Sequence, residues 1–88
     1  MGYRVVEFQS TPNPNAIKCV LDRSPGDRPR AYRDPAAADG DPLARALFAI
    51  HGVTGLLIHD GWITVNKADK ARWTPIRAGV ERALRDIA

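Results

Sequence analysis

The segment Val53-Thr-Gly-Leu-Leu-Ile-His-Asp-Gly-Trp-Ile-Thr-Val-Asn-Lys67 decides the fold of this chain. It holds two short runs rich in β-branched and aromatic side chains, separated by the dipeptide Asp60-Gly61. That dipeptide is favoured in the two-residue turns that join antiparallel strands. The segment therefore predicts a β-hairpin, with Ile63 and Val65 on the buried face and Trp62 on the opposite face, because successive side chains alternate.

A second hairpin is predicted near the N-terminus. Residues 3–9 are again rich in β-branched and aromatic types, and residues 16–22 place Ile17, Cys19 and Leu21 on one face of a strand. Between them, the sequence Ser-Thr-Pro-Asn-Pro-Asn combines prolines, which fix φ, with asparagines, whose side chains bond to nearby backbone. We expect a tight connection between two antiparallel strands.

The middle of the chain predicts one weak strand and one helix. Residues 23–40 are rich in proline, glycine, arginine and aspartate, as surface connections are. Structureless loops of that length are uncommon in compact domains, so we expect a short edge strand at 30–33, centred on Tyr32. Asp41, followed by proline, is a strong helix start because its carboxylate accepts hydrogen bonds from free backbone amides. We expect this helix to run to a glycine cap at Gly52.

The last helix is expected to begin between residues 69 and 75. Its apolar side chains recur at helical spacing and form one stripe, made of Trp73, Ile76, Val80, Leu84 and Ile87. Two helices that each carry an apolar stripe are most simply buried on one face of a sheet. The sequence therefore predicts a two-layer α+β fold, in which an antiparallel or mixed sheet of four to five strands packs against both helices.

Length and composition predict one globular domain. With 88 residues the chain has room for a single core, so residues 1–88 are expected to form one domain. A hydrophobic content of 44% with 26% charged residues is typical of folded proteins. No apolar run approaches the ~18 residues of a membrane span, and the N-terminus lacks the pattern of a signal peptide. With only one cysteine, these features predict a cytoplasmic protein that does not bind membranes.

Residues able to bind a metal or catalyse a reaction are scarce. A zinc site needs about four ligands, and the chain offers Cys19, His51 and His59 at scattered positions. An iron-sulfur cluster usually takes four thiolates, of which this chain can supply one. Cys19 alternates with core residues, so we interpret it as a small buried hydrophobe. We therefore predict no catalytic residue and no metal ligand; a small enzyme that uses His59 or Cys19 is the least favoured alternative.

Five residues are candidates for contact with a partner protein. Trp62 is predicted to place a large aromatic ring on the outward face of its hairpin, and such rings often anchor interfaces. Lys18 lies on the outward face of the second strand. Thr11, Asn13 and Asn15 present hydrogen-bonding groups from a loop that its prolines make rigid, which lowers the entropic cost of binding. The alternative for these three is that they only form the turn.

The net positive charge leaves nucleic acid as an alternative class of partner. The formal net charge is +3, and four arginines lie on or beside the last helix: Arg72, Arg77, Arg82 and Arg85. A small nucleic-acid-binding domain could use them against phosphates. We consider this partner unlikely to be the main one, because aspartates and arginines are interspersed along the chain rather than gathered in one block.

Five motifs, in order along the chain, carry a resemblance to a known family. They are Thr-Pro-Asn-Pro-Asn-Ala-Ile-Lys at 11–18, Asp-Pro-Leu-Ala-Arg-Ala-Leu-Phe at 41–48, Gly-Val at 52–53, Trp-Ile-Thr-Val-Asn-Lys at 62–67, and Trp73 followed by an amphipathic helix. Because it carries these motifs in this order, the chain resembles the N-terminal domain of Nfu-type (NifU-related) iron-sulfur scaffold proteins.

The resemblance implies a role near iron-sulfur cluster maturation. In full-length members a second domain holds the cluster through a Cys-x-x-Cys pair, and Cys19 stands where the family usually has an aromatic residue. We therefore expect a non-enzymatic accessory or protein-binding module, either a monomer or a weak dimer. It should meet an iron-sulfur cluster only through a partner protein, such as a cluster carrier or recipient.

Overall fold

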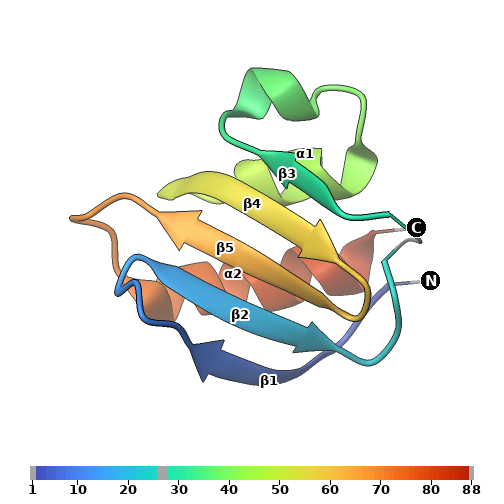
Figure 1. Cartoon of the computed structure of the whole chain (residues 1–88), viewed down its shortest axis with the longest axis horizontal. Coiled ribbons are helices and arrows are strands. Elements are labelled where there is room, and N and C mark those ends of the chain that lie inside the picture. The colour runs from blue at the N-terminus through green and yellow to red at the C-terminus, as the bar shows by residue number, and fades with distance from the viewer. Residues whose placement is uncertain (1, 26–27, 88) are drawn as a thin grey trace.

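The computed structural model describes residues 2–25 and 28–87 and shows the two-layer α+β fold (Figure 1). A five-stranded sheet with the order β1-β2-β5-β4-β3 forms one layer, and every strand pair in it is antiparallel. The helices α1 and α2 lie together on its other side. The elements are β1 (Val5–Ser10), β2 (Ala16–Leu21), β3 (Arg30–Tyr32), the 3-10 helix η1 (Pro35–Ala38), α1 (Pro42–Phe48), β4 (Val53–His59), β5 (Trp62–Lys67) and α2 (Trp73–Asp86).

The core lies between the sheet and the helices and follows the predicted alternation. In β5, Ile63 and Val65 are fully buried, and Ile63 pairs with Cys19 across the β2–β5 ladder. From the helical layer, the buried side chains are Leu43, Ala44, Leu47, Ile76, Val80 and Leu84. The antiparallel sheet thus buries one face only, as such sheets commonly do.

Two helix boundaries differ from the sequence expectation. Helix α1 ends at Phe48 and not at Gly52. After Phe48 the amide of Ile50 bonds to the carbonyl of Leu47 at 3.1 Å, so an i to i−3 turn replaces the helical bond. Gly52 has a φ of +96° and closes this turn rather than capping the helix itself. Ile87 likewise lies just beyond α2, with extended backbone angles.

The expected edge strand exists, and Asp41 attaches it to the helical layer. The Asp41 carboxylate accepts hydrogen bonds from the amides of Leu43 (3.1 Å) and Ala44 (3.3 Å) at the start of α1. Its other oxygen accepts from the Tyr32 hydroxyl at 2.8 Å and lies 3.1 Å from the Arg30 guanidinium. The hydrogen bond to Asp41 raises the pKa of Tyr32. One carboxylate therefore caps α1 and holds both ends of β3.

No helix in the described parts of the chain is both long and apolar enough to cross a membrane.

We predict that Asp41→Ala lowers the free energy of unfolding by about 3 kcal/mol, since it removes a helix cap and leaves the Arg30 charge without its partner. Urea denaturation followed by far-UV circular dichroism measures the loss. Asp39→Ala is the matched control, because Asp39 is exposed and its side chain forms no hydrogen bond or ion pair with another described residue. A loss for Asp41→Ala no larger than that for Asp39→Ala would contradict the role assigned to this carboxylate.

Candidate interaction face

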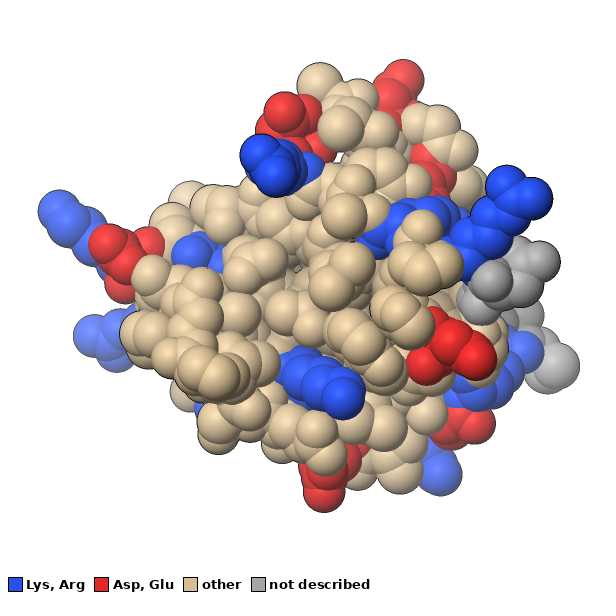
Figure 2. Space-filling model, in the orientation of Figure 1, with Lys and Arg blue, Asp and Glu red and all other residues tan. Residues whose placement is uncertain are grey.

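One face of the sheet carries no helix, and we call it the open face. It is the side turned toward the viewer in Figure 1, and most of its surface is uncharged in Figure 2. Strand register and burial place on it, among others, the side chains of Glu7, Gln9, Lys18, Val20, Leu57, His59, Trp62 and Thr64. Charged groups are few among these, so the open face can exclude water around an aromatic centre, as interface cores do.

Trp62 lies at the centre of a cation-aromatic cluster on the open face. The His59 ring stacks on it with 4.8 Å between centroids and 1° between planes. The Lys18 ammonium lies 4.7 Å from the Trp62 ring centroid. His59 comes from β4 and Lys18 from β2, the two strands that flank β5. The structure thus brings together two of the predicted contact residues, Lys18 and Trp62.

The cluster changes what was expected of Trp62. The sequence predicted a large exposed ring, whereas the ring is half-buried because His59 and Lys18 cover it from both neighbouring strands. An aromatic ring held on two sides has lost much of its rotational freedom before any partner arrives. It offers a fixed contact surface.

His59 belongs to this face, although the sequence reasoning did not include it among the candidate contact residues. The two-residue turn makes His59 and Trp62 direct cross-strand partners, and this register was the signal available in the sequence. The imidazole Nδ1 accepts a hydrogen bond from the Asp60 amide at 2.9 Å. In the neutral ring the proton therefore lies on Nε2. The ring is oriented both by this bond and by the stack.

The loop between β1 and β2 uses most of its polar groups internally. The Thr11 hydroxyl donates toward the carbonyls of Asn13 (2.8 Å) and Ala16 (3.0 Å) and accepts from the Asn13 amide. The Asn13 side-chain oxygen accepts from the Asn15 amide at 2.9 Å. These bonds are the turn chemistry of Ser, Thr and Asn side chains. They leave the exposed Pro12, Asn13 and Pro14 as the outer rim of the loop.

A second set of contacts ties this loop to the start of α2. The indole N–H of Trp73 donates to the carbonyl of Pro14 at 3.1 Å. The Lys67 ammonium donates to the Asn15 side-chain oxygen at 3.0 Å, and the Asn15 side-chain amide donates to the Asp69 carboxylate. Thr11, Asn13 and Asn15 therefore lie at one end of the sheet in a rigid loop. They are separate from the cluster around Trp62.

Cys19 is a core residue in this structure. Its side chain is fully buried opposite Ile63, and burial raises the pKa of its thiol to about 12 because the thiolate would be desolvated. Among residues 2–25 and 28–87, no group of three or more His, Cys, Asp or Glu side chains is placed to hold a metal ion. The surroundings of Cys19 therefore do not fit ligation of an iron-sulfur cluster.

The arginines of the last helix do not form a block of positive charge. Arg77 lies with its guanidinium carbon 5.9 Å from the Phe8 ring centroid, and Arg85 pairs with Asp86 at 3.4 Å. Glu81 and Asp86 are interleaved with the arginines along α2. A phosphate backbone is usually met by cations gathered on one face. The nucleic-acid alternative therefore rests on the net charge and on no feature of this geometry.

Comparison with known proteins accounts for the combination of this fold and these motifs. Residues 6–88 match the family described as scaffold protein Nfu/NifU N terminal. The chain belongs to this family. The motifs at 11–18 and 62–67, which carried the resemblance, form the loop pinned by Trp73 and the strand that presents Trp62 in this Nfu N-terminal domain.

Curated relatives of this Nfu N-terminal domain are longer proteins. The human NFU1 iron-sulfur cluster scaffold homolog, mitochondrial, is 33% identical over 87 residues, which cover 97% of this chain and 34% of the relative. NifU-like protein 5, mitochondrial, of Arabidopsis thaliana is 30% identical over 87 residues, covering 93% of this chain and 30% of the relative. The chain thus spans about a third of the length of the curated relatives it matches.

Solved structures share the fold of this Nfu N-terminal domain. The NifU-like protein from Saccharomyces cerevisiae superposes with a TM-score of 0.78 at 23% identity, over 94% of this chain and 76% of that one. A Staphylococcus aureus protein solved by X-ray crystallography gives a TM-score of 0.76 at 23% identity, over 91% of this chain and 96% of that one. The two-layer fold is therefore common to chains with little sequence identity.

The pKa of about 12 predicts how the Cys19 thiol responds to pH. The thiol of the unfolded chain releases its proton near pH 9, whereas the folded chain keeps this proton up to a pH of about 12. The folded state is therefore less stable relative to the unfolded state as the pH rises from 9 toward 12. This contribution amounts to at most about 1.4 kcal/mol per pH unit. Urea unfolding of the wild type and of Cys19→Val across this range measures it, and the variant should show the shallower decline.

The same burial predicts that a thiol-modifying reagent reacts with Cys19 only after denaturant is added. Equal pH slopes for wild type and Cys19→Val, or rapid modification of the native protein, would contradict a desolvated core thiol.

Proposed function

We propose that this domain is a non-enzymatic protein-binding module that serves iron-sulfur cluster assembly or delivery, and that its open face contacts the partner. The observation that carries the proposal is the cluster of Lys18, Trp62 and His59, an aromatic ring fixed between two strands on a sheet face without a helix. The iron-sulfur cluster itself would be held by the partner, or by another part of a longer protein, because Cys19 is enclosed in the core.

Two further lines of support come from the family and from the chemistry of the face. The human relative is named an iron-sulfur cluster scaffold homolog, which supports a role in that process. Trp, Tyr and Arg dominate binding energy at interfaces, and most charged residues are depleted from interface centres. Trp62 surrounded by Val20, Leu57 and Thr64 has that composition, and Lys18 adds one cation for an acidic group on the partner.

The rim of the β1–β2 loop is a smaller part of this proposal. Thr11, Asn13 and Asn15 hold the loop in shape, and the exposed Pro12 and Pro14 would then touch a partner at the end of the sheet. Prolines fix the backbone, so little entropy is lost on contact.

We predict that a photo-crosslinking amino acid placed at Thr64 captures an iron-sulfur assembly or recipient protein from the native cell. Thr64 pairs with Lys18 across the β2–β5 ladder, so Lys18→Glu should reduce the yield about tenfold by reversing a charge at the contact. Lys70→Glu makes the same change of charge on an exposed residue outside the sheet and should leave the yield unchanged. Mass spectrometry identifies the captured protein.

The proposal fails if the crosslinker at Asp39, away from the open face, captures the same protein with the same yield. It also fails if Lys18→Glu and Lys70→Glu behave alike.

We further predict that anaerobic incubation of this 88-residue chain with iron and sulfide yields no stoichiometric cluster. One buried thiol with a raised pKa cannot supply the thiolates that a cluster needs. Absorbance spectra and iron counting measure the product, and Cys19→Val should give the same result as the wild type. A stoichiometric cluster that is lost in Cys19→Val would overturn the separation of binding module and cluster holder.

A further inference from the structure

Strand β1 forms an edge of the sheet, and no other described strand pairs with its outer side (Figure 1). The direction of its backbone groups follows from its neighbour β2. The amide of Leu21 donates to the carbonyl of Gly61, which directly precedes β5, so the backbone groups of Leu21 face β5. Successive residues of a strand direct these groups to alternate sides, so those of Val20 and Lys18 face β1.

The outward-facing backbone groups of β1 belong to Phe8 and Ser10. Glu7 and Gln9 pair with the two β2 residues that face β1, so their amides and carbonyls bond within the sheet. Phe8 and Ser10 alternate with them and direct theirs to the free edge. An edge of this kind accepts an extended strand, because each added amide and carbonyl gains a partner.

The side chains beside this edge form a complementary pair. Glu7 and Gln9 are both exposed on the open face, one on each side of Phe8 in the sequence. The Gln9 side-chain amide donates to the Glu7 carboxylate within the strand. The free edge therefore carries an acceptor and a donor at positions that a reversal of the chain about Phe8 exchanges.

We propose that a second copy of this chain adds to β1 in an antiparallel, two-fold contact centred on Phe8. In that register Glu7 of each copy lies opposite Gln9 of the other, so the donor and the acceptor pair twice across the contact. A contact centred on Glu7 would instead set two carboxylates opposite each other, which is destabilising. A strand from a different protein fits only if it brings a donor and an acceptor at the same spacing, whereas a second copy always does.

The contact is short, so the dimer is expected to be weak. A β-bulge between Val5 and Glu7 interrupts the regular strand at its N-terminal end, and bulges limit pairing at sheet edges. Val6, which is 58% exposed, lies at this bulge and gains cover from the second copy. An interface of this size is of the transient class, and we expect a dissociation constant on the order of 100 µM.

The two-fold contact places both open faces on the same side of one continuous sheet. Two strand spacings separate β5 from β1 in each copy, and one more lies between the copies. At about 4.8 Å per spacing, the two Trp62 rings are roughly 24 Å apart. Two identical sites on one surface bind a two-fold symmetric partner more tightly than one site does. This consequence rests on the function proposed above, whereas formation of the dimer does not.

Sedimentation velocity at chain concentrations from about 10 µM to about 1 mM, which bracket the expected dissociation constant, measures the association. Gln9→Glu sets like charges opposite each other twice and should weaken the dimer about tenfold. Glu7→Gln combined with Gln9→Glu exchanges donor and acceptor and should restore the wild-type affinity. Both residues are exposed, so neither change removes a core contact. Thr54→Glu adds the same charge at an exposed residue of β4 and should have no effect.

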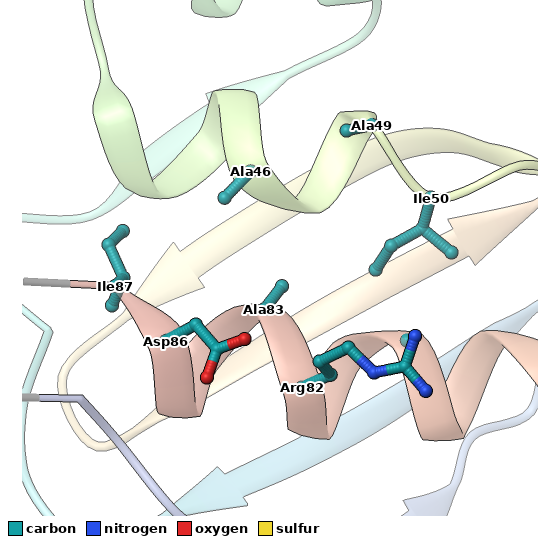
Figure 3. A pocket seen from close by; sticks show the side chains of 8 residues that line it. Ala46, Ala49, Ile50, Arg82, Ala83, Asp86 and Ile87 are labelled. Carbon is teal, nitrogen blue, oxygen red and sulfur yellow. The ribbon is translucent and has the colours of Figure 1, made fainter.

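Intermolecular NOEs identify the contact surface in an equal mixture of isotope-labelled and unlabelled chains. Opposite residues that do not exchange hydrogen bonds across the contact lie closest, so an NOE between the Hα atoms of Glu7 and Gln9 is expected. The proposal is overturned if the chain is a monomer at the highest concentration, or if the double variant stays as weak as Gln9→Glu. It is also overturned if the NOEs place the contact on the open face or at the pocket between α1 and α2, whose lining residues include Arg82 and Asp86 (Figure 3). A dimer that forms as expected while the crosslinker at Thr64 captures no iron-sulfur protein counts against the proposed function alone.

Discussion

The Asp41 carboxylate is the constraint on which the arrangement of the two layers depends. It is 8% exposed and is the one buried polar or charged residue among those the structure describes. Its cost of burial is offset because both oxygens are satisfied, one by the amides that begin α1 and the other by Tyr32 and Arg30 of the edge strand. The sheet edge and the helix start are thereby fixed to each other across the connection at residues 33–41, which contains η1.

The two layers present chemically different surfaces, the open face of the sheet and the outer side of the helices. The open face is nearly neutral and has an aromatic ring braced by His59 and Lys18. The helical layer carries an apolar pocket between α1 and α2, and Arg82 and Asp86 are among its lining residues.

The position of Cys19 does not suit its thiol to ligate an iron-sulfur cluster. The thiol packs opposite Ile63, where ligation would require opening the sheet-helix core. The recognition role proposed for this domain is consistent with that position. The chain spans about a third of the human relative, which is named an iron-sulfur cluster scaffold homolog.

The sequence by itself determined both hairpins, the start of α1 at Asp41 and the identity of the core. These follow from turn chemistry, capping and side-chain period, which act over a few neighbouring residues. Only the tertiary structure decided the all-antiparallel strand order, the half-burial of Trp62, the early end of α1 and the pocket between α1 and α2. The loop at Thr11 looked available for binding until its hydroxyl was seen to bond within the turn. Such features depend on contacts between residues that are far apart in the sequence. A local sequence pattern does not show which residue of another strand or helix will make the contact.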